Sequence, residues 1–192
     1  MLDTPLQRRT YLAATGAVTA ALASFSGCIG RGQAGTLATQ VTDQPGDIAD
    51  FESCVVTITG MWLGPEEARS GEADDVDPAG REYYAYDEPQ EADLVQLQDG
   101  ETQLVDEREL NVASYEFLQL EIDGIDAVLE NGSEATLEVP GAAPVTFNES
   151  FRIRAETRTV FTADFTPVRR GQTDEYVLQP VPEGISIEYG EE

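Results

Sequence analysis

The sequence contains no histidine, and all 11 of its basic residues are arginine. Without an imidazole group, Ser-His-Asp and Cys-His catalysis are excluded, as are zinc and haem sites built on histidine. The 37 acidic residues give a formal net charge of -26 at pH 7. Because such a field repels phosphate, nucleic acid and an anionic membrane face are both unfavourable partners.

The remaining composition is that of a folded domain. The chain has 192 residues, of which 41% are hydrophobic, enough for one domain with a core of its own. Acid excess together with arginine in place of lysine resembles the proteins of salt-loving archaea. Since the screening length falls to about 3 Å in 1 M salt, the self-repulsion of the chain is largely removed in brine. We therefore expect a halophilic domain and not a disordered acidic tail.

The first 27 residues have the layout of a secretory signal. A basic segment containing Arg8 and Arg9 precedes a weakly apolar run that ends near Phe25. This run is too short and too rich in small polar residues for a membrane-spanning helix. The arginine pair resembles a twin-arginine signal, which exports proteins that have already folded.

The residues at the end of this segment resemble a lipobox, in which the thiol of Cys28 is acylated and becomes the first mature residue. Cleavage without lipidation near residues 23–27 is the alternative. Residues 28–35, which are rich in glycine, are expected to form a flexible tether ahead of a domain at residues 36–192. This predicts a lipid-anchored protein on the extracellular face of the cell membrane, with the membrane as its partner through Cys28.

Acylation of Cys28 leaves Cys54 as the one other thiol, so an internal disulfide is excluded. Cys54 lies in a β-branched run, 53–58, and has no basic residue near it in sequence. A nucleophilic thiol needs such a neighbour to lower its pKa. We therefore expect a small buried side chain.

Downstream of Thr36 the pattern is one of short strands separated by turn signals, without convincing helical periodicity. It predicts an all-β sandwich, prealbumin-like or immunoglobulin-like, with no substantial helix outside the signal peptide. An acidic loop is expected at 64–82, and a hairpin at Asn131-Gly132, whose residues favour positive φ. A change of apolar phase between Phe117 and Leu118 predicts a bulge. The expected strands are 36–42, 54–63, 83–86, 92–97, 103–106, 114–122, 126–130, 134–139, 145–147, 151–155, 159–165, 176–181 and 185–189.

Several segments, taken in order, resemble the domain of unknown function 4382 family. They are Leu37 to Pro45, Asp93 to Leu97, Ser114 to Leu120, Phe161 to Phe165 and Tyr176 to Val181. The resemblance covers roughly residues 36–181 and implies an exported, often lipid-anchored β-sandwich of bacteria or haloarchaea. Because the family has no established activity, the resemblance implies no catalytic residue.

Three groups of residues could contact a ligand. Trp62 and the segment containing Tyr83, Tyr84 and Tyr86 could form an aromatic platform for sugars, although tyrosines this close in a strand must point to both faces. Arg152 and Arg154 alternate with apolar residues and could grip a carboxylate. Alternatively, they neutralise a neighbouring acidic strand, the one bearing Glu116, Gln119 and Glu121.

The remaining candidates are less specific. Asp74, Asp75 and Asp77 form the densest acidic cluster, but their spacing does not match a calcium loop, and a hydrated acidic surface is the favoured interpretation. A second cluster follows the first strand at 43–50. Asn131 and Asn148 begin glycosylation sequons.

These observations predict a non-catalytic protein with a binding or structural role in the envelope of a halophile. No cofactor is expected, and the partner would be an envelope glycan or another surface protein. A carbohydrate-binding module is the first alternative. A carboxylate-based hydrolase is the second, and less favoured because carboxylate pairs are common in so acidic a chain.

Overall fold

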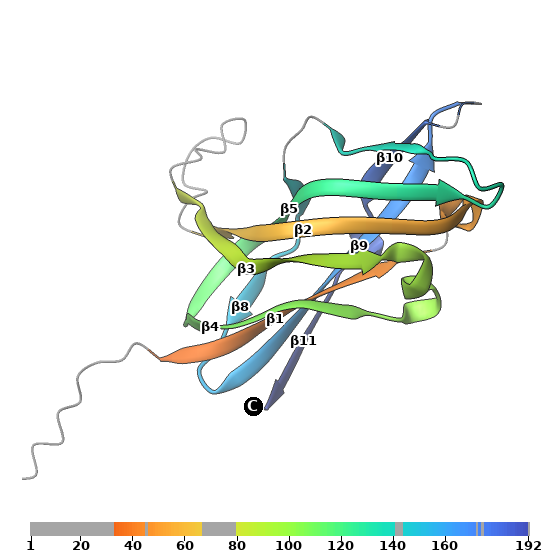
Figure 1. The fold of residues 1–192 in the computed structure, drawn as a ribbon. Coiled ribbons are helices and arrows are strands. Elements are labelled where there is room, and N and C mark those ends of the chain that lie inside the picture. Colours follow the sequence, from red (N-terminus) through yellow and green to blue (C-terminus); the bar gives the residue numbers. More distant parts are fainter. Residues whose placement is uncertain are drawn as a thin grey trace, which may run out of the picture. The chain divides into compact units, whose positions relative to one another are not determined.

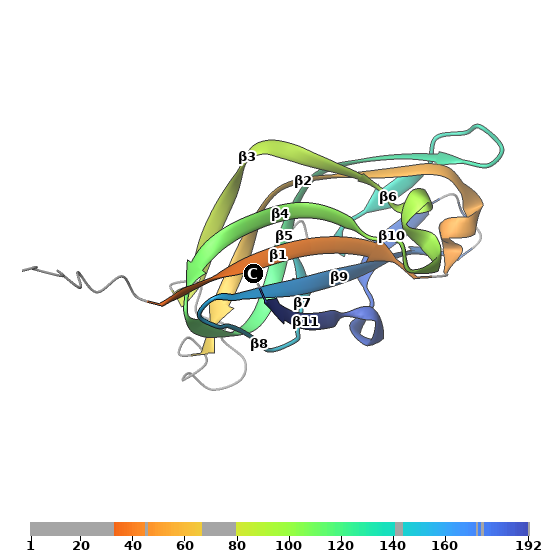
Figure 2. The ribbon, with the colours of Figure 1, turned by 90° about the horizontal axis from the view of Figure 1, so that it is seen from below.

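A computed structural model describes residues 33–44, 46–66, 80–140, 144–171, 173 and 175–191. Two β-sheets pack face to face, as Figures 1 and 2 show in two orthogonal views. The apolar core side chains lie between them. The expectation of an all-β sandwich is confirmed. Helix is limited to short 3-10 segments among these residues, and the expected signal peptide lies outside them.

The first sheet has the strand order β4-β1-β9-β10-β6, with β11 also paired to β9. The β1 and β9 strands run parallel, as do β6 and β10, and the other pairs are antiparallel. Since β10 pairs with the second half of β9 and β11 with the first half, both occupy the same edge of that strand. The strands are β1 (Ala34–Asp43), β4 (Gln103–Asn111), β6 (Thr136–Glu138), β9 (Thr157–Arg169), β10 (Glu175–Pro180) and β11 (Ser186–Glu191).

The second sheet has the order β3-β2-β5-β7, with β8 paired to the beginning of β5, and all its pairs are antiparallel. Its strands are β2 (Phe51–Pro65), β3 (Glu82–Asp93), β5 (Ala113–Leu129), β7 (Val145–Phe147) and β8 (Phe151–Ile153). Three 3-10 segments complete the described chain: η1 (Asp47–Asp50), η4 (Leu94–Gly100) and η6 (Pro182–Gly184).

The core follows from the two-residue period of the strands. Along β9, Phe161, Ala163 and Phe165 are fully buried and face the second sheet. Phe147 of that sheet packs edge-on against Phe165 at a ring separation of 5.2 Å. Each such aromatic side chain contributes about 1.5–3 kcal/mol through burial, so the inward positions supply most of the stability of the sandwich.

Most strand boundaries differ from the sequence prediction by a few residues, and two of these differences change the assignment of a segment. The first strand begins at Ala34, so residues 34 and 35 belong to β1 and not to the tether. The predicted strand at 92–97 is wrong beyond Asp93, where η4 begins. The reason is local, because the Asp93 carboxylate accepts hydrogen bonds from the Val95 and Cys54 amides at 3.2 and 3.0 Å and caps the turn.

The expected acidic loop is shorter than predicted at both ends. Gly64 and Pro65 belong to β2 and Glu82 to β3, while residues 67–79 lie outside the described residues. The predicted strands at 114–122 and 126–130 form one continuous strand, β5. At 83–86 the predicted strand is the beginning of β3.

The Asn131-Gly132 turn is present, with Gly132 at φ 80° and its amide bonded to the Leu129 carbonyl at 2.8 Å, but the predicted hairpin between 126–130 and 134–139 is reduced to a single bridge. After one bridge to β5 the chain crosses to the first sheet, where β6 pairs with β10. A bulge near Phe117 is also confirmed, but the extra residue is Glu116. Tyr115 and Leu118 therefore both belong to the core, and Phe117 packs on Gly64 instead.

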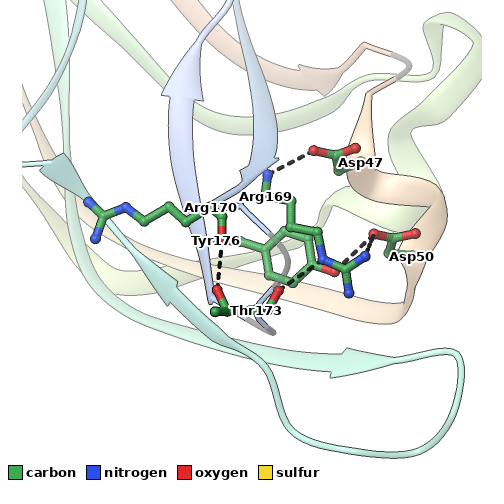
Figure 3. Close-up of polar contacts among 6 residues, drawn as sticks. All are labelled: Asp47, Asp50, Arg169, Arg170, Thr173 and Tyr176. Carbon is green, nitrogen blue, oxygen red and sulfur yellow. Dashed lines mark hydrogen bonds and ion pairs between the residues drawn. The ribbon is translucent and has the colours of Figure 1, made fainter.

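Polar contacts among Asp47, Asp50, Arg169 and Tyr176, named here the polar latch, connect η1 to β9 and β10 at one end of the sandwich (Figure 3). The Arg169 amide donates to Asp47 at 2.7 Å, which joins β9 to η1. Buried Tyr176 donates from its hydroxyl to Asp50 Oδ2 at 2.9 Å, and the Arg169 guanidinium lies 3.6 Å from the same oxygen. Phe51 packs edge-on against the Tyr176 ring at 4.7 Å, so the latch is anchored in the core.

Candidate functional site

The three tyrosines at the beginning of β3 point to both faces, as their spacing requires. Tyr83 pairs with Trp62 of β2 and lies on the outer face of the second sheet, where it is 43% exposed. Tyr84 pairs with the buried Met61 and packs against the core, as does Tyr86. The sheet therefore divides the predicted platform into two separate surfaces.

The outer surface is a row of polar and aromatic side chains across the sheet. The Trp62 and Tyr83 rings lie 4.5 Å apart, and the Arg81 guanidinium lies 4.8 Å from the centre of the Trp62 ring. Arg81 also donates to Gln119 Oε1 at 2.6 Å, and the Tyr83 hydroxyl donates to Glu121. Because Arg81 stacks on the Trp62 ring, that ring is already partnered from within the chain and is a poor platform for a sugar.

The inner surface opens into a groove between the edge strands β3 and β4, which lie side by side in Figures 1 and 2. The groove has a volume of about 790 Å³. Its shape arises from a large bulge, since Ile58 pairs with Gln90 and Gly60 with Ala85, so that one β2 residue spans four residues of β3. Residues 85–88 and 90 of β3, which include most of this bulge, form one wall, and residues 104–108 of β4 form the other.

Arg108 contacts side chains from both strands that form the groove. It forms a two-point ion pair with Asp106, at 2.5 and 2.7 Å, and its guanidinium lies 4.9 Å from the Tyr84 ring and 5.7 Å from the Tyr86 ring. These contacts hold the guanidinium in one orientation and, led by the Asp106 hydrogen bond, raise its pKa. Neither Asp106 nor Arg108 was singled out in the sequence. Their alternate spacing, which places both on one face of a strand, was the available signal.

One wall of the groove carries an unsatisfied polar group. The Tyr86 hydroxyl is buried and has no hydrogen-bond partner among the described residues. Burial is the main cause that raises its pKa, so the group remains a neutral donor at physiological pH. For Tyr84, burial and a hydrogen bond to Glu82 raise the pKa to about 12. A buried hydroxyl without a partner is unfavourable by about 1–3 kcal/mol, and because this oxygen is enclosed, Tyr86 lines the groove with its ring and not with its hydroxyl.

The predicted pair of arginines forms a third surface, at the other edge of the second sheet. Arg152 and Arg154 are exposed on either side of buried Ile153. In the described part of the chain neither forms an ion pair, and Gln119 and Glu121 bond to Arg81 and Tyr83 instead. The predicted neutralisation of the acidic strand is therefore not found between these residues. The Arg154 guanidinium instead stacks on Tyr189, 3.8 Å from the ring centre.

Two carboxylates are buried at one end of the first sheet. Asp43 is 2% and Asp164 0% exposed, and their carboxylate oxygens have no hydrogen-bond partner of normal geometry in the described chain. Burial is the main cause that raises the pKa of Asp43 to about 8 and that of Asp164 to about 6. Asp43 and Phe165 pair across β1 and β9, one residue beyond Asp164, and the charge of Asp164 also raises the pKa of Asp43. The oxygens of both carboxyls are enclosed, and Asp43 also borders a second groove of about 600 Å³.

The remaining predicted residues are placed as follows. Asn131 and Asn148 are exposed, and the Asn131 side chain accepts from the Ser133 amide at 2.9 Å within its turn. Cys54 is fully buried, and burial raises the pKa of its thiol to about 12, as expected for a structural cysteine. Arg8, Arg9, Cys28, Asp74, Asp75 and Asp77 lie outside the described residues.

Two properties concern metals and membranes. Across the described ranges no group of three or more acidic or cysteine side chains is placed to hold a metal ion. The same part of the chain contains no helix long and apolar enough to cross a bilayer.

Comparison with known proteins places the fold in a family. No curated protein matches the chain. A family model described as "Domain of unknown function (DUF4382)" matches residues 34–180, from the first residue of β1 to the last of β10. Because this match spans most of the chain, the protein belongs to the DUF4382 family of domains of unknown function.

Proposed function

We propose that the protein is an exported, lipid-anchored and non-catalytic binding domain on the outer surface of a halophilic cell, and that its ligand is a carbohydrate of the envelope. The groove between β3 and β4 carries this proposal. Export and anchoring are supported by the arginine pair Arg8-Arg9 and by Cys28 at the end of the apolar run.

The groove has the composition that favours a sugar. Its lining includes Tyr86, Gln90, Asp106 and Arg108, with Leu104 at the rim, which is 46% exposed. A pyranose ring offers hydroxyl groups to the carboxylate, amide and guanidinium and presents an apolar face to Leu104 or the tyrosine ring. A volume of about 790 Å³ lies within the usual range for small-molecule sites.

A non-catalytic role agrees with the state of the charged groups. Arg108 and Asp106 are held by each other, and the two carboxyls with raised pKa values, Asp43 and Asp164, are enclosed. The groove also exposes the carboxylates of Asp87 and Glu88 on its β3 wall, which can accept hydrogen bonds from sugar hydroxyls beside the fixed Asp106–Arg108 pair.

Equilibrium binding of purified envelope polysaccharide in concentrated KCl tests the proposal. We expect saturable binding that Arg108→Gln weakens at least about tenfold, the effect of losing about 1.4 kcal/mol. Trp62→Phe on the outer face is the matched control and should leave the affinity unchanged. Equal binding by all three proteins, or loss on Trp62→Phe alone, would contradict a ligand site in the groove.

A further inference from the structure

Arg152, Arg154 and Tyr189 form a surface, named here the arginine patch, that is held together by contacts among these three residues. The Arg152 amide donates to the Tyr189 hydroxyl at 3.2 Å, and Arg154 stacks on the ring at 3.8 Å. Tyr189 therefore joins β11 of the first sheet to β8 of the second. The contacts hold Arg154 against the tyrosine and leave both guanidinium groups exposed.

The two guanidinium groups are exceptional in so acidic a chain. Arg108, Arg158, Arg169 and Arg170 each form an ion pair with a carboxylate. Among the described arginines, only the two of the arginine patch and Arg81 form none, and Arg81 is bonded to Gln119 and stacked on Trp62. With 37 acidic residues in the sequence, unpaired exposed arginines leave their hydrogen-bonding capacity for a ligand from outside.

The arginine patch also lies where the chain enters the domain. The Glu156 amide, in the turn between β8 and β9, donates to the Ala34 carbonyl at 3.0 Å. A methyl group on Gly35 would overlap the carbonyl oxygen of Arg154. Figures 1 and 2 show this turn beside the beginning of β1. Only four residues lie between Cys28 and Gln33, and the five residue steps of a fully extended chain span at most about 18 Å.

We propose that the arginine patch docks on the phosphate groups of anionic lipids in the membrane that holds Cys28. Planar guanidinium groups bond phosphate oxygens at two points, which suits this ligand. The net charge of the chain opposes its recruitment from solution, but a domain fixed at Cys28 is already at the surface. Its repulsion then favours the orientation that turns the unpaired arginines toward the lipid.

This inference rests on the proposed anchoring, and its test separates the two. The full chain is coupled through the Cys28 thiol to vesicles that contain a maleimide lipid, so attachment does not depend on acylation in the cell. Cys54 is fully buried and stays unreacted. Energy transfer from Trp62, the single tryptophan, to a dansyl-labelled lipid reports the orientation of the domain relative to the membrane. Trp62 lies toward the same end as the patch, because Tyr115 of β5 pairs with both Pro65 and Phe151.

In about 1 M KCl, where long-range fields are screened to about 3 Å, transfer should be higher on phosphatidylglycerol vesicles than on phosphatidylcholine vesicles. The double variant Arg152→Gln, Arg154→Gln should reduce it to the phosphatidylcholine value. Glu156→Gln, which removes a negative charge from the same turn, should raise it. Arg170→Gln is the matched control, since Arg170 follows the far end of β9, and should leave it unchanged.

Equal transfer on both kinds of vesicle would overturn the inference, as would an equal loss in the Arg170→Gln chain. Far-UV circular dichroism of each variant verifies that the sandwich is folded. Release of an unacylatable protein from cells tests the anchoring proposal independently, so failure of one proposal is distinguishable from failure of the other.

Discussion

The hydroxyl of Tyr176 and the carboxylate of Asp50 are joined by a hydrogen bond of 2.9 Å across 126 residues of sequence. The ring is fully buried, so only the oxygen reaches the polar latch (Figure 3). Tyr176→Phe keeps the packing of the ring on Phe51 and removes that bond. We expect urea unfolding to show a loss of about 1 kcal/mol, the usual net value of one such bond. The control Tyr83→Phe removes a hydroxyl that bonds at the surface and should lower the unfolding free energy by less. An equal loss would show that the Tyr176–Asp50 bond stabilises the fold no more than a surface bond does.

The buried carboxyls predict an unusual pH dependence. The pKa of Asp43 is raised from 3.8 to about 8 in the folded chain, so the folded state retains a proton that the unfolded state has lost. Its contribution to stability is complete below about pH 4 and declines as the pH rises to about 8. Asp164, with a pKa raised to about 6, adds a smaller decline below that pH. The unfolding free energy of the wild type should therefore fall relative to that of Asp43→Asn as the pH rises. A difference between the two proteins that does not change with pH would contradict this account.

Gly35 tests the contact between β1 and the turn that carries the arginine patch. A side chain at this position would meet the backbone carbonyl of Arg154, which cannot move without separating the strands. Gly35→Ala should therefore destabilise the domain by about 1–3 kcal/mol, the usual cost of overpacking. Gly190→Ala is a suitable control because open space surrounds its Cβ position. Equal melting temperatures of the two variants would contradict the packing described for the beginning of β1.

Salt should decide whether the domain folds. Lowering KCl from about 3 M to about 0.1 M extends the screening length to about 10 Å, so that the many exposed acids repel one another. Far-UV circular dichroism should show loss of β-structure over this range. A spectrum that stays constant would contradict adaptation to brine.

How much of this could be foreseen depends on the range over which each feature is encoded. Local signals predicted the sandwich, the Asn131-Gly132 turn and the division of Tyr83 and Tyr84 between faces, because alternation along a strand requires only neighbouring residues. Such signals did not foresee η4, where the Asp93 side chain replaces strand pairing with a cap.

Local sequence patterns could not predict the groove either. Tyr86 and Arg108 meet because β3 and β4 are edge strands of different sheets, and that arrangement follows from pairings over the whole domain. The arginine patch is similar, since Tyr189 reaches Arg152 from a strand 37 residues away. The spacing of Arg152 and Arg154 predicted a shared exposed location, but their lack of carboxylate partners required the strand order.

Anchoring has its own test. Cys28→Ser removes the only thiol that the lipobox-like segment offers, so the protein should appear in the medium instead of the membrane fraction. Quantitative immunoblotting of both fractions measures the redistribution, with Cys54→Ser as the control. Membrane association unchanged in Cys28→Ser cells would show that another feature anchors the chain.

The central claim is that the groove between β3 and β4 binds a glycan, and a thermal melt in concentrated KCl tests it most directly. A glycan present at about 100 times its dissociation constant should stabilise the fold by about 2.7 kcal/mol and raise the melting temperature measurably. We predict this rise for the wild type and its loss in the Arg108→Gln chain, measured against each protein without glycan. An envelope glycan that binds the wild type yet raises the melting temperature of both chains equally, or a panel of such glycans that raises neither, would contradict the proposed site.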